Sequence, residues 1–370
     1  MTLLSNRIST TKYALERLKK RQEISDKYNI PIEQILDLSL GDNLFIPPSL
    51  IQKILVKEVQ SIDPRDSYPI DYFAFIDEIS RFMGIQADSI YAGLTHNLLI
   101  QQLVLTATKP KDSIVLLNPD KEIYSKIAKN HSLTINALEL ADDFELDSER
   151  VLELAKETKS KIIVFSSPHY PTANQFKEEE ILTIVKKTKI PVIIDESYVE
   201  FGKYSLVNQV QNYDNLTVVR SFSKAWGLGS VSCAFLVSNP DFINMLKESY
   251  FIEEIPPIHL LASNYILQNP YKFVELINNF ILERKRVIEH LRMLSGLKVY
   301  KSDTNFLFIK FKNNVDELYE QLCSKGIIIQ TFSDFDFFKD SDKSFLVTLG
   351  DIHINDRFIV AIMELLESIL

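Results

Sequence analysis

Short apolar runs alternate with amphipathic stretches through the middle of the chain. The runs are rich in β-branched residues and carry few polar ones, which is typical of strands buried on both faces of a parallel sheet. We predict such strands at 113–117, 161–165, 191–195, 216–220 and 231–237. Stretches with helical periodicity lie among them, at 94–108, 121–130, 148–157 and 178–187. This alternation predicts a doubly wound α/β domain with a mostly parallel sheet.

The pattern changes after residue 257, where strands and helices no longer alternate regularly. The later elements that we predict are a long helix at 272–294, strands at 305–310, 327–329 and 345–348, and helices at 315–324 and 355–370. They indicate a smaller α+β domain. We therefore divide the chain into an N-terminal arm and small-domain segment (1–46), a large α/β domain (47–255) and a C-terminal small α+β domain (256–370).

Composition and charge restrict the class of protein. With 46% hydrophobic and 25% charged residues, the chain has a typical globular composition. Its net charge of −9 argues against a nucleic-acid partner, because proteins that bind the phosphate backbone are usually basic. Two cysteines are too few for a disulfide framework or a zinc cluster, so we expect no metal site. We find neither a secretory signal nor a transmembrane run, and we expect a cytoplasmic protein with no membrane partner.

Polar residues that can carry chemistry follow two of the predicted strands. Asp195 ends one strand and Tyr198 follows it, while Ser221, Ser223 and Lys224 follow the next strand. Ligands of open α/β sheets bind beyond the carboxyl ends of the strands, so we expect these side chains to lie together. A buried carboxylate needs a partner, which a protonated ring nitrogen would supply. The lysine can form a Schiff base with an aldehyde, and the hydroxyls can hold a phosphate. Together these groups predict a pyridoxal 5′-phosphate site.

A second phosphate contact is predicted where a helix begins. Leu94 and Thr95 lie between a possible short strand and this helix, so their backbone N–H groups are free to bind an anion.

The chain has only 9 glycines and contains neither Gly-x-Gly-x-x-Gly nor Gly-x-x-x-x-Gly-Lys. A dinucleotide-binding oxidoreductase therefore lacks its main sequence support.

Two segments carry a resemblance to a known family. Asp195–Phe201, with the sequence DESYVEF, and Ser221–Gly229, with the sequence SFSKAWGLG, resemble the fold-type-I pyridoxal-phosphate aminotransferases of class I and II. The resemblance is greatest to the branch that contains histidinol-phosphate aminotransferase and threonine-phosphate decarboxylase, and it covers almost the whole chain. Further matching segments follow in family order, at 42–47, 67–69, 166–172, 304–306 and 348–350. This family implies a doubly wound, mostly parallel sheet in a large cofactor-binding domain and a smaller α+β domain.

The resemblance also implies roles for the matched residues. Lys224 would form the Schiff base and later move the Cα proton, Asp195 would keep the ring nitrogen protonated, and Tyr198 would hydrogen-bond the phenolic oxygen. The implied cofactor contacts are Leu94, Thr95, Asp195, Tyr198, Ser221, Ser223, Lys224, Tyr68 and Tyr170. The implied substrate contacts are Asn43, Tyr124 and Asn305. Tyr68 would reach the phosphate in the other subunit, which implies a homodimer with shared active sites.

Several positions depart from the family pattern. Tyr170 stands where the family has the asparagine that binds the phenolic oxygen, and Lys121 stands where it has the aromatic residue that stacks on the ring. Ser232 replaces an arginine that binds the cofactor phosphate. Leu346 and Gln330 replace two arginines that bind the substrate. We therefore expect a preserved centre for the cofactor, weaker retention of the cofactor and an altered substrate clamp.

Three functions remain open at this point. The preferred one is a pyridoxal-phosphate-dependent aminotransferase that acts on a small amine or amino-acid substrate. The alternatives are a decarboxylase, or an enzyme of other Cα chemistry, with the same cofactor, and a non-catalytic homologue that serves as a binding or assembly subunit. Because Leu346 cannot neutralise a carboxylate, we expect either a substrate other than an ordinary α-amino acid or an arginine from elsewhere, with Arg65 and Arg220 as candidates.

Overall fold

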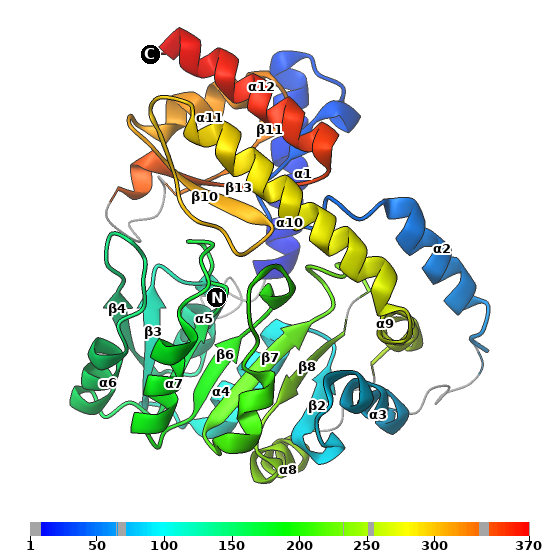
Figure 1. The fold of residues 1–370 in the computed structure, drawn as a ribbon, viewed down its shortest axis with the longest axis vertical. Helices are drawn as coiled ribbons and strands as arrows, with labels where there is room; N and C mark the ends of the chain where they lie inside the picture. The colour runs from blue at the N-terminus through cyan, green and yellow to red at the C-terminus, as the bar shows by residue number, and fades with distance from the viewer. Residues whose placement is uncertain are drawn as a thin grey trace, which may run out of the picture.

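Two main β-sheets organise the chain, and they lie one above the other in the view of Figure 1. The computed structural model describes residues 9–63, 65, 72–231, 233–250, 255–332 and 340–369. The helices are α1 (Ser9–Tyr28), α2 (Pro48–Val59), α3 (Tyr72–Met83), α4 (His96–Ala107), α5 (Glu122–Asn130), α6 (Ser148–Glu157), α7 (Glu178–Lys187), α8 (Pro240–Ser249), α9 (Pro257–Gln268), α10 (Pro270–Arg292), α11 (Val315–Ser324) and α12 (Ile352–Ile369). The strands are β1 (Leu36–Asp37), β2 (Ile90–Gly93), β3 (Ser113–Asn118), β4 (Thr134–Glu139), β5 (Ile162–Ser166), β6 (Val192–Asp195), β7 (Leu216–Ser221), β8 (Ala234–Val237), β9 (Leu297–Val299), β10 (Phe306–Phe311), β11 (Ile327–Ile328), β12 (Gln330–Thr331) and β13 (Ser344–Thr348).

The larger sheet has the strand order β2-β8-β7-β6-β5-β3-β4 among the described residues. Its strands pair in parallel except at β8, which is antiparallel to both β2 and β7. Helices cover both faces, so consecutive residues of a central strand enter different cores. In β6, Ile193 packs in the core cluster that contains residues of α4, α5 and α8, while Ile194 packs in the cluster that contains residues of α6 and α7. The predicted doubly wound, mostly parallel sheet is confirmed.

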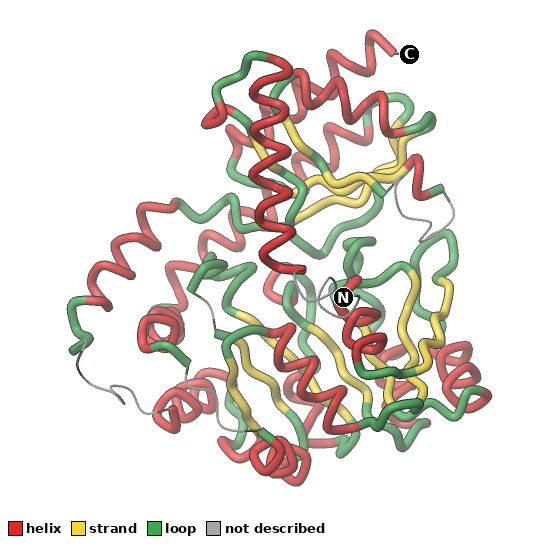
Figure 2. The backbone as a smooth tube through the Cα atoms, turned by 180° about the vertical axis from the view of Figure 1, so that it is seen from behind, coloured by secondary structure: helices red, strands yellow, loops and turns green. Residues whose placement is uncertain are grey.

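The smaller sheet is antiparallel and has the order β12-β13-β10-β9. In Figure 2 it lies above the large sheet, with helices packed around it. The N-terminal segment joins this part, because β1 pairs in parallel with β11. We keep the division into 1–46, 47–255 and 256–370 as a proposal for the domain limits.

Several parts of the structure differ from the predicted elements. Strand β4 was not predicted, because it lies at the edge of the sheet and only Leu138 in it is fully buried. Helices α3, α8 and α9 and the short strands β1 and β9 were not predicted either. The strand predicted at 327–329 is instead two short strands in different sheets, β11 beside β1 and β12 beside β13. A pattern of buried residues cannot distinguish these cases, because strands of different sheets look alike in sequence.

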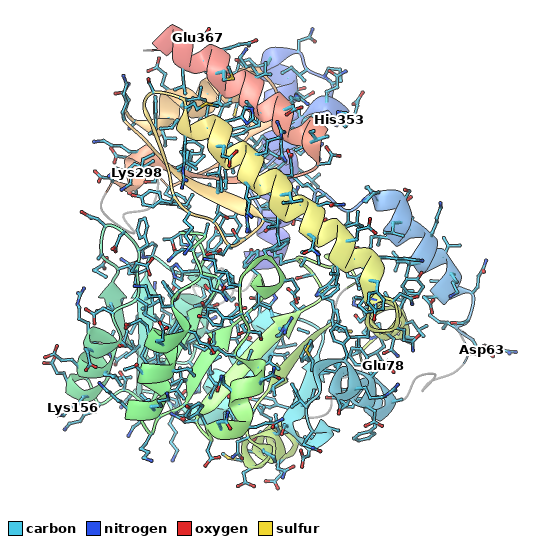
Figure 3. All side chains as sticks on the ribbon, viewed as in Figure 1. Asp63, Glu78, Lys156, Lys298, His353 and Glu367 are labelled. Atoms are coloured by element: carbon cyan, nitrogen blue, oxygen red, sulfur yellow. The ribbon has the colours of Figure 1, made fainter. Side chains whose placement is uncertain are left out.

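Many charged side chains lie at the outside of the molecule, although Asp195, Glu196 and Arg220 are buried. Lys156, His353 and Glu367 lie at the periphery of the molecule (Figure 3). Within the described residues, no helix combines the length and the apolarity needed to cross a membrane.

Candidate active site

Asp195 is the last residue of β6 and has no exposed surface. Its Oδ2 atom accepts hydrogen bonds from Lys121 Nζ at 2.5 Å and from the Tyr124 hydroxyl at 2.6 Å. Its Oδ1 atom accepts from the backbone N–H of Ser197 at 2.9 Å and from the hydroxyl of the same residue. Burial alone would raise the pKa of this carboxyl, but the Lys121 ammonium and the hydrogen bonds lower it, so the group is a buried anion.

Lys224 follows the end of β7 and is half-buried. Its Nζ atom donates to the carbonyl of Gly41 at 3.2 Å and lies 5.8 Å from the centre of the Tyr198 ring. Burial lowers the pKa of this amine, and the nearby Lys121 ammonium lowers it further, while Asp42 and Asp195 raise it. A lowered pKa favours the neutral amine, which is the form that attacks a carbonyl.

The segment that faces Lys224 begins at Gly41, where the backbone has a φ of +61°. A Cβ atom at this position would lie 3.1 Å from the hydroxyl oxygen of Tyr198, so glycine suits both the left-handed conformation and the close approach. Asn305 holds the segment by donating to the carbonyls of Gly41 and Asp42, at 3.1 and 2.9 Å. Asn305 directly precedes β10, so the small sheet fixes the position of Gly41 and Asp42 beside Lys224.

The predicted phosphate contacts come together at one edge of the large sheet. Ala234 of β8 pairs with Gly93 at the end of β2 and with Ser221 at the end of β7, so both strand ends lie beside it. The Ser221 and Ser223 hydroxyl oxygens are 2.8 Å apart. Thr95 caps α4, and its hydroxyl accepts from the backbone N–H of Leu98 at 3.2 Å. Two hydroxyls thus lie near a helix N-terminus, an arrangement that suits a phosphate.

Two tyrosines and one phenylalanine line the side of the site toward the small sheet. Tyr170 and Tyr198 each pack against Phe306 of β10, with ring centres 5.6 and 5.2 Å apart. Tyr198 is 3% exposed, and its hydroxyl has no hydrogen bond to another described residue. Burial raises the pKa of this hydroxyl, so it stays protonated and can donate to a ligand oxygen.

The three predicted substrate contacts have different surroundings. Asn43 uses both ends of its amide on backbone groups, donating to the Lys224 carbonyl at 2.8 Å and accepting from the Ile46 N–H at 2.9 Å. Tyr124 donates its hydroxyl to Asp195 Oδ2 at 2.6 Å. Asn305 keeps a buried Oδ1 atom that has no hydrogen-bond partner among the described residues. Of the three, Asn305 alone offers a buried free acceptor; a substrate contact stays a prediction for all of them.

The two positions of the expected substrate clamp lie opposite each other in the small sheet. Leu346 of β13 pairs with Gln330 of β12 on one side and with Phe308 of β10 on the other. Leu346 has no exposed surface and belongs to the apolar core. Neither residue of this pair can neutralise a carboxylate, as the sequence indicates.

The two arginines considered as replacements already have partners. Arg220 Nη2 donates to Glu200 Oε1 at 2.6 Å, and the arginine side chain is 10% exposed. Arg65 forms a surface ion pair with Asp63, and its side chain is 87% exposed. A substrate carboxylate would have to displace Glu200 from the first, so neither arginine is a ready-made clamp.

Sequence reasoning gave no role to two residues of the site. His96, the first residue of α4, has electrostatic interactions with Asp195, Lys121 and Lys224. Burial lowers the pKa of His96 to about 4, with further lowering by the two lysines. Lys121 was noted only as a departure from the family pattern, although it contacts the Asp195 carboxylate. It follows β3 after Pro119 and Asp120, and no local feature of the sequence indicates that its side chain reaches Asp195. Tyr68 and Ser232 lie outside the described residues.

Comparison with known proteins gives a consistent result. The sequence model of the family described as "Aminotransferase class I and II" matches residues 33–362. A histidinol-phosphate aminotransferase of Caldanaerobacter subterraneus subsp. tengcongensis is 27% identical over 94% of this chain and 98% of its own. One from Clostridium novyi is 30% identical over 68% of this chain and 71% of its own. The crystal structure of a histidinol-phosphate aminotransferase from Sinorhizobium meliloti, in complex with pyridoxal-5′-phosphate, superimposes with a TM-score of 0.82 at 16% identity, covering 95% of each chain.

The side chains of the site fit pyridoxal phosphate. Asp195 is a buried anion suited to a protonated ring nitrogen, and the Tyr198 hydroxyl is available for the phenolic oxygen. Ser221 and Ser223 would hold the phosphate together with the N-terminus of α4, and Lys224 would bind the aldehyde carbon. The bound cofactor supplies an electron sink for the negative charge that forms at the substrate Cα.

Proposed function

The chain belongs to the class I and II aminotransferases, and on this premise we propose that it transfers the amino group of a small amine, amino alcohol or modified amino acid. It is a pyridoxal-phosphate-dependent transferase, similar to histidinol-phosphate aminotransferases. One observation supports the proposed substrate class. Leu346 and Gln330 are register partners on neighbouring strands, at the two positions where the family resemblance implies substrate-binding arginines, and one is apolar and the other uncharged.

The residues of the large domain would divide the work as follows. Lys224 would hold the cofactor and then move the proton between the substrate Cα and the cofactor, which its lowered pKa favours. Asp195 would orient the ring and keep its nitrogen protonated, and Tyr198 would donate to the phenolic oxygen. Tyr170 and Phe306 would exclude water from this side of the ring, because they pack together between the two sheets.

We infer the substrate class from the lack of a cationic side chain at Leu346 and Gln330. A glutamate donor carries two carboxylates, and a buried carboxylate without a cationic partner is expensive. Leu346 and Gln330 offer none, and Arg220 is already paired with Glu200. An amine or amino alcohol avoids this cost. We further propose a cytoplasmic homodimer in which Tyr68 reaches the phosphate in the other subunit.

A donor panel tests this proposal. Purified holoenzyme is mixed with one donor at a time, and the visible band of the cofactor is followed to measure the first half-reaction. The panel contains glutamate, histidinol phosphate, a monoamine, an amino alcohol and a modified amino acid. We expect faster conversion with the last three than with glutamate or histidinol phosphate, because Leu346 and Gln330 offer no cation to the carboxylates of the one or to the phosphate of the other. Lys224→Ala should convert no donor.

The outcomes separate the three candidate functions. Glutamate-dependent transamination of a phosphorylated ketone at ordinary efficiency would show that the substrate assignment is wrong. Release of carbon dioxide from an amino acid would instead identify a decarboxylase. A protein that binds the cofactor but converts no donor would be a non-catalytic homologue.

A further inference from the structure

The carboxylate of Asp195 has no free acceptor position in this structure. A carboxylate can accept about four hydrogen bonds, two on each oxygen. Lys121 and Tyr124 donate to Oδ2, and the backbone and side chain of Ser197 donate to Oδ1. A further donor, such as a protonated ring nitrogen, must therefore displace one of these groups.

Lys121 is the group that a cationic ligand would displace. The N–H and O–H donors of Ser197 belong to the turn that directly follows β6, and Tyr124 is a neutral donor held in α5. Lys121 carries a positive charge on a flexible side chain that is 11% exposed, and it precedes α5 without capping it through its side chain. A cation can replace a cation beside Asp195 without leaving a buried negative charge unpaired.

The position of the Lys121 ammonium supports the same conclusion. Its Nζ atom is 2.5 Å from Asp195 Oδ2 and 5.2 Å from the centre of the Tyr198 ring. Lys224 Nζ lies 5.8 Å from the same ring. The Lys121 ammonium thus lies among the side chains that would hold the cofactor ring. The Lys121 ammonium and the cofactor ring nitrogen cannot both occupy the space beside Asp195 Oδ2.

We propose that Lys121 is a built-in competitor of the cofactor, holding Asp195 as an ion pair until the protonated ring nitrogen replaces its ammonium. This inference rests on the proposed function. Because binding must break a buried, charge-assisted contact, Lys121 lowers the affinity for the cofactor. The fraction of loaded enzyme then depends on the free concentration of pyridoxal phosphate, so cofactor supply regulates the site.

The test measures affinity rather than turnover. The probe is 4′-deoxypyridoxine 5′-phosphate, which keeps the ring nitrogen and the phosphate but has no aldehyde to react with Lys224. Trp226, the only tryptophan of the chain, lies two residues after Lys224 and is 5% exposed, so its fluorescence can report binding. Lys121→Met removes the charge at similar length, and we expect it to bind the probe about tenfold more tightly or better. We expect Lys121→Arg, which keeps the charge, to bind within about threefold of the wild type.

Two further variants isolate the cause. Lys203→Met removes a lysine whose Nζ lies 3.3 Å from another buried aspartate, Asp303, outside the site, and should leave the affinity unchanged. In an Asp195→Asn background, Lys121→Met should give no gain, because the contact it breaks is then no longer an ion pair. The double variant also leaves no buried charge unpaired, so it guards against failure of Lys121→Met to fold.

The outcomes distinguish this inference from the proposed function. Equal or weaker binding of the probe by Lys121→Met would overturn the competitor role, even if the wild type transaminates. A tenfold gain in Lys121→Met together with an inactive wild type would support the competitor role and refute the proposed transamination. If neither protein binds the probe or pyridoxal phosphate at millimolar concentration, both proposals fall.

Discussion

The two halves of the site treat charge in opposite ways. On the large sheet, the buried Asp195 lies beside Lys121 and near Lys224. Ser221 is the last residue of the neighbouring strand β7, and the Ser223 hydroxyl lies beside that of Ser221. On the small sheet, the corresponding strands present Leu346 and Gln330. In our proposal the first half would bind and activate a charged cofactor, while the second would leave a substrate carboxylate without a cation. This difference supports our proposal that the residues for the cofactor are kept and that the substrate differs from that of the histidinol-phosphate aminotransferases.

The largest expected effect comes from removing the amine of the charged half. Lys224→Ala should lower turnover by about 10²- to 10⁴-fold or more, because both the covalent anchor and the proton carrier are lost. The variant should still bind cofactor non-covalently. The measurement is borohydride reduction of the wild type followed by peptide mapping, which should place a pyridoxyl group on Lys224. A pyridoxyl group on Lys121 instead would contradict the assignment.

The second effect concerns the anion of the same half. Asp195→Asn should lower turnover by about a hundredfold, because an amide cannot keep the ring nitrogen protonated as a carboxylate does. The fold should persist, since the N–H and hydroxyl of Ser197 can still donate to the amide oxygen and the Tyr124 hydroxyl can accept from the amide nitrogen. Turnover and circular dichroism of the variant decide the matter. Near-normal turnover would remove Asp195 from the catalytic residues.

The third effect adds charge to the neutral half. Gln330→Arg should raise kcat/KM for acidic amino donors about tenfold, because a guanidinium can bind a carboxylate with two hydrogen bonds. Gln330 is half-buried, so the larger side chain has access to solvent. Gln330→Met is the neutral control and should leave the donor preference as in the wild type. A preference that is the same in both variants would show that position 330 does not face the substrate.

The smallest effect concerns a second carboxyl of the charged half. Burial raises the pKa of Glu196 from 4.5 to about 7, although Arg220, the Leu206 N–H and the Ser205 hydroxyl lower it. The folded protein therefore binds this proton more tightly than the unfolded chain does. The stabilisation is complete below about pH 4.5 and is lost as the pH rises through 7.

Thermal unfolding as a function of pH measures this contribution. Glu196→Gln should remove a decrease in Tm of about a few degrees between these pH values, as expected for a chain of this size. Lys203→Met serves as a control that should retain the decrease. A wild type whose Tm rises across this range, and whose rise disappears in Glu196→Gln, would show that Glu196 is ionised in the folded protein.

Much of the large half could be predicted from the sequence. Asp195, Tyr198, Ser221, Ser223 and Lys224 lie directly after apolar runs that become β6 and β7. These strands are neighbours in the sheet, so two short segments of sequence already define the centre of the site. The predicted strand ends were accurate here because a strand buried on both faces stands out as an apolar run.

The contacts between distant segments could not be predicted in this way. Lys121 follows β3, which is separated from β6 by β5, and nothing local in the sequence indicates that its side chain reaches Asp195. Tyr124 is predicted as a substrate contact, and only the structure shows that its hydroxyl bonds the same carboxylate. His96 gave no signal, because a histidine at the start of a helix has the same sequence pattern whether or not it faces other charges.

The sequence by itself determined the alternation of strands and helices, the family and the residue types at the centre of the site. These features depend on local periodicity and short motifs, which a chain carries before it folds. The tertiary structure alone decided which charges meet, that Arg220 is paired with Glu200, and that Leu346 lies opposite Gln330. The physical reason is that electrostatic energy depends on distance and burial in space, and the order of the strands sets both.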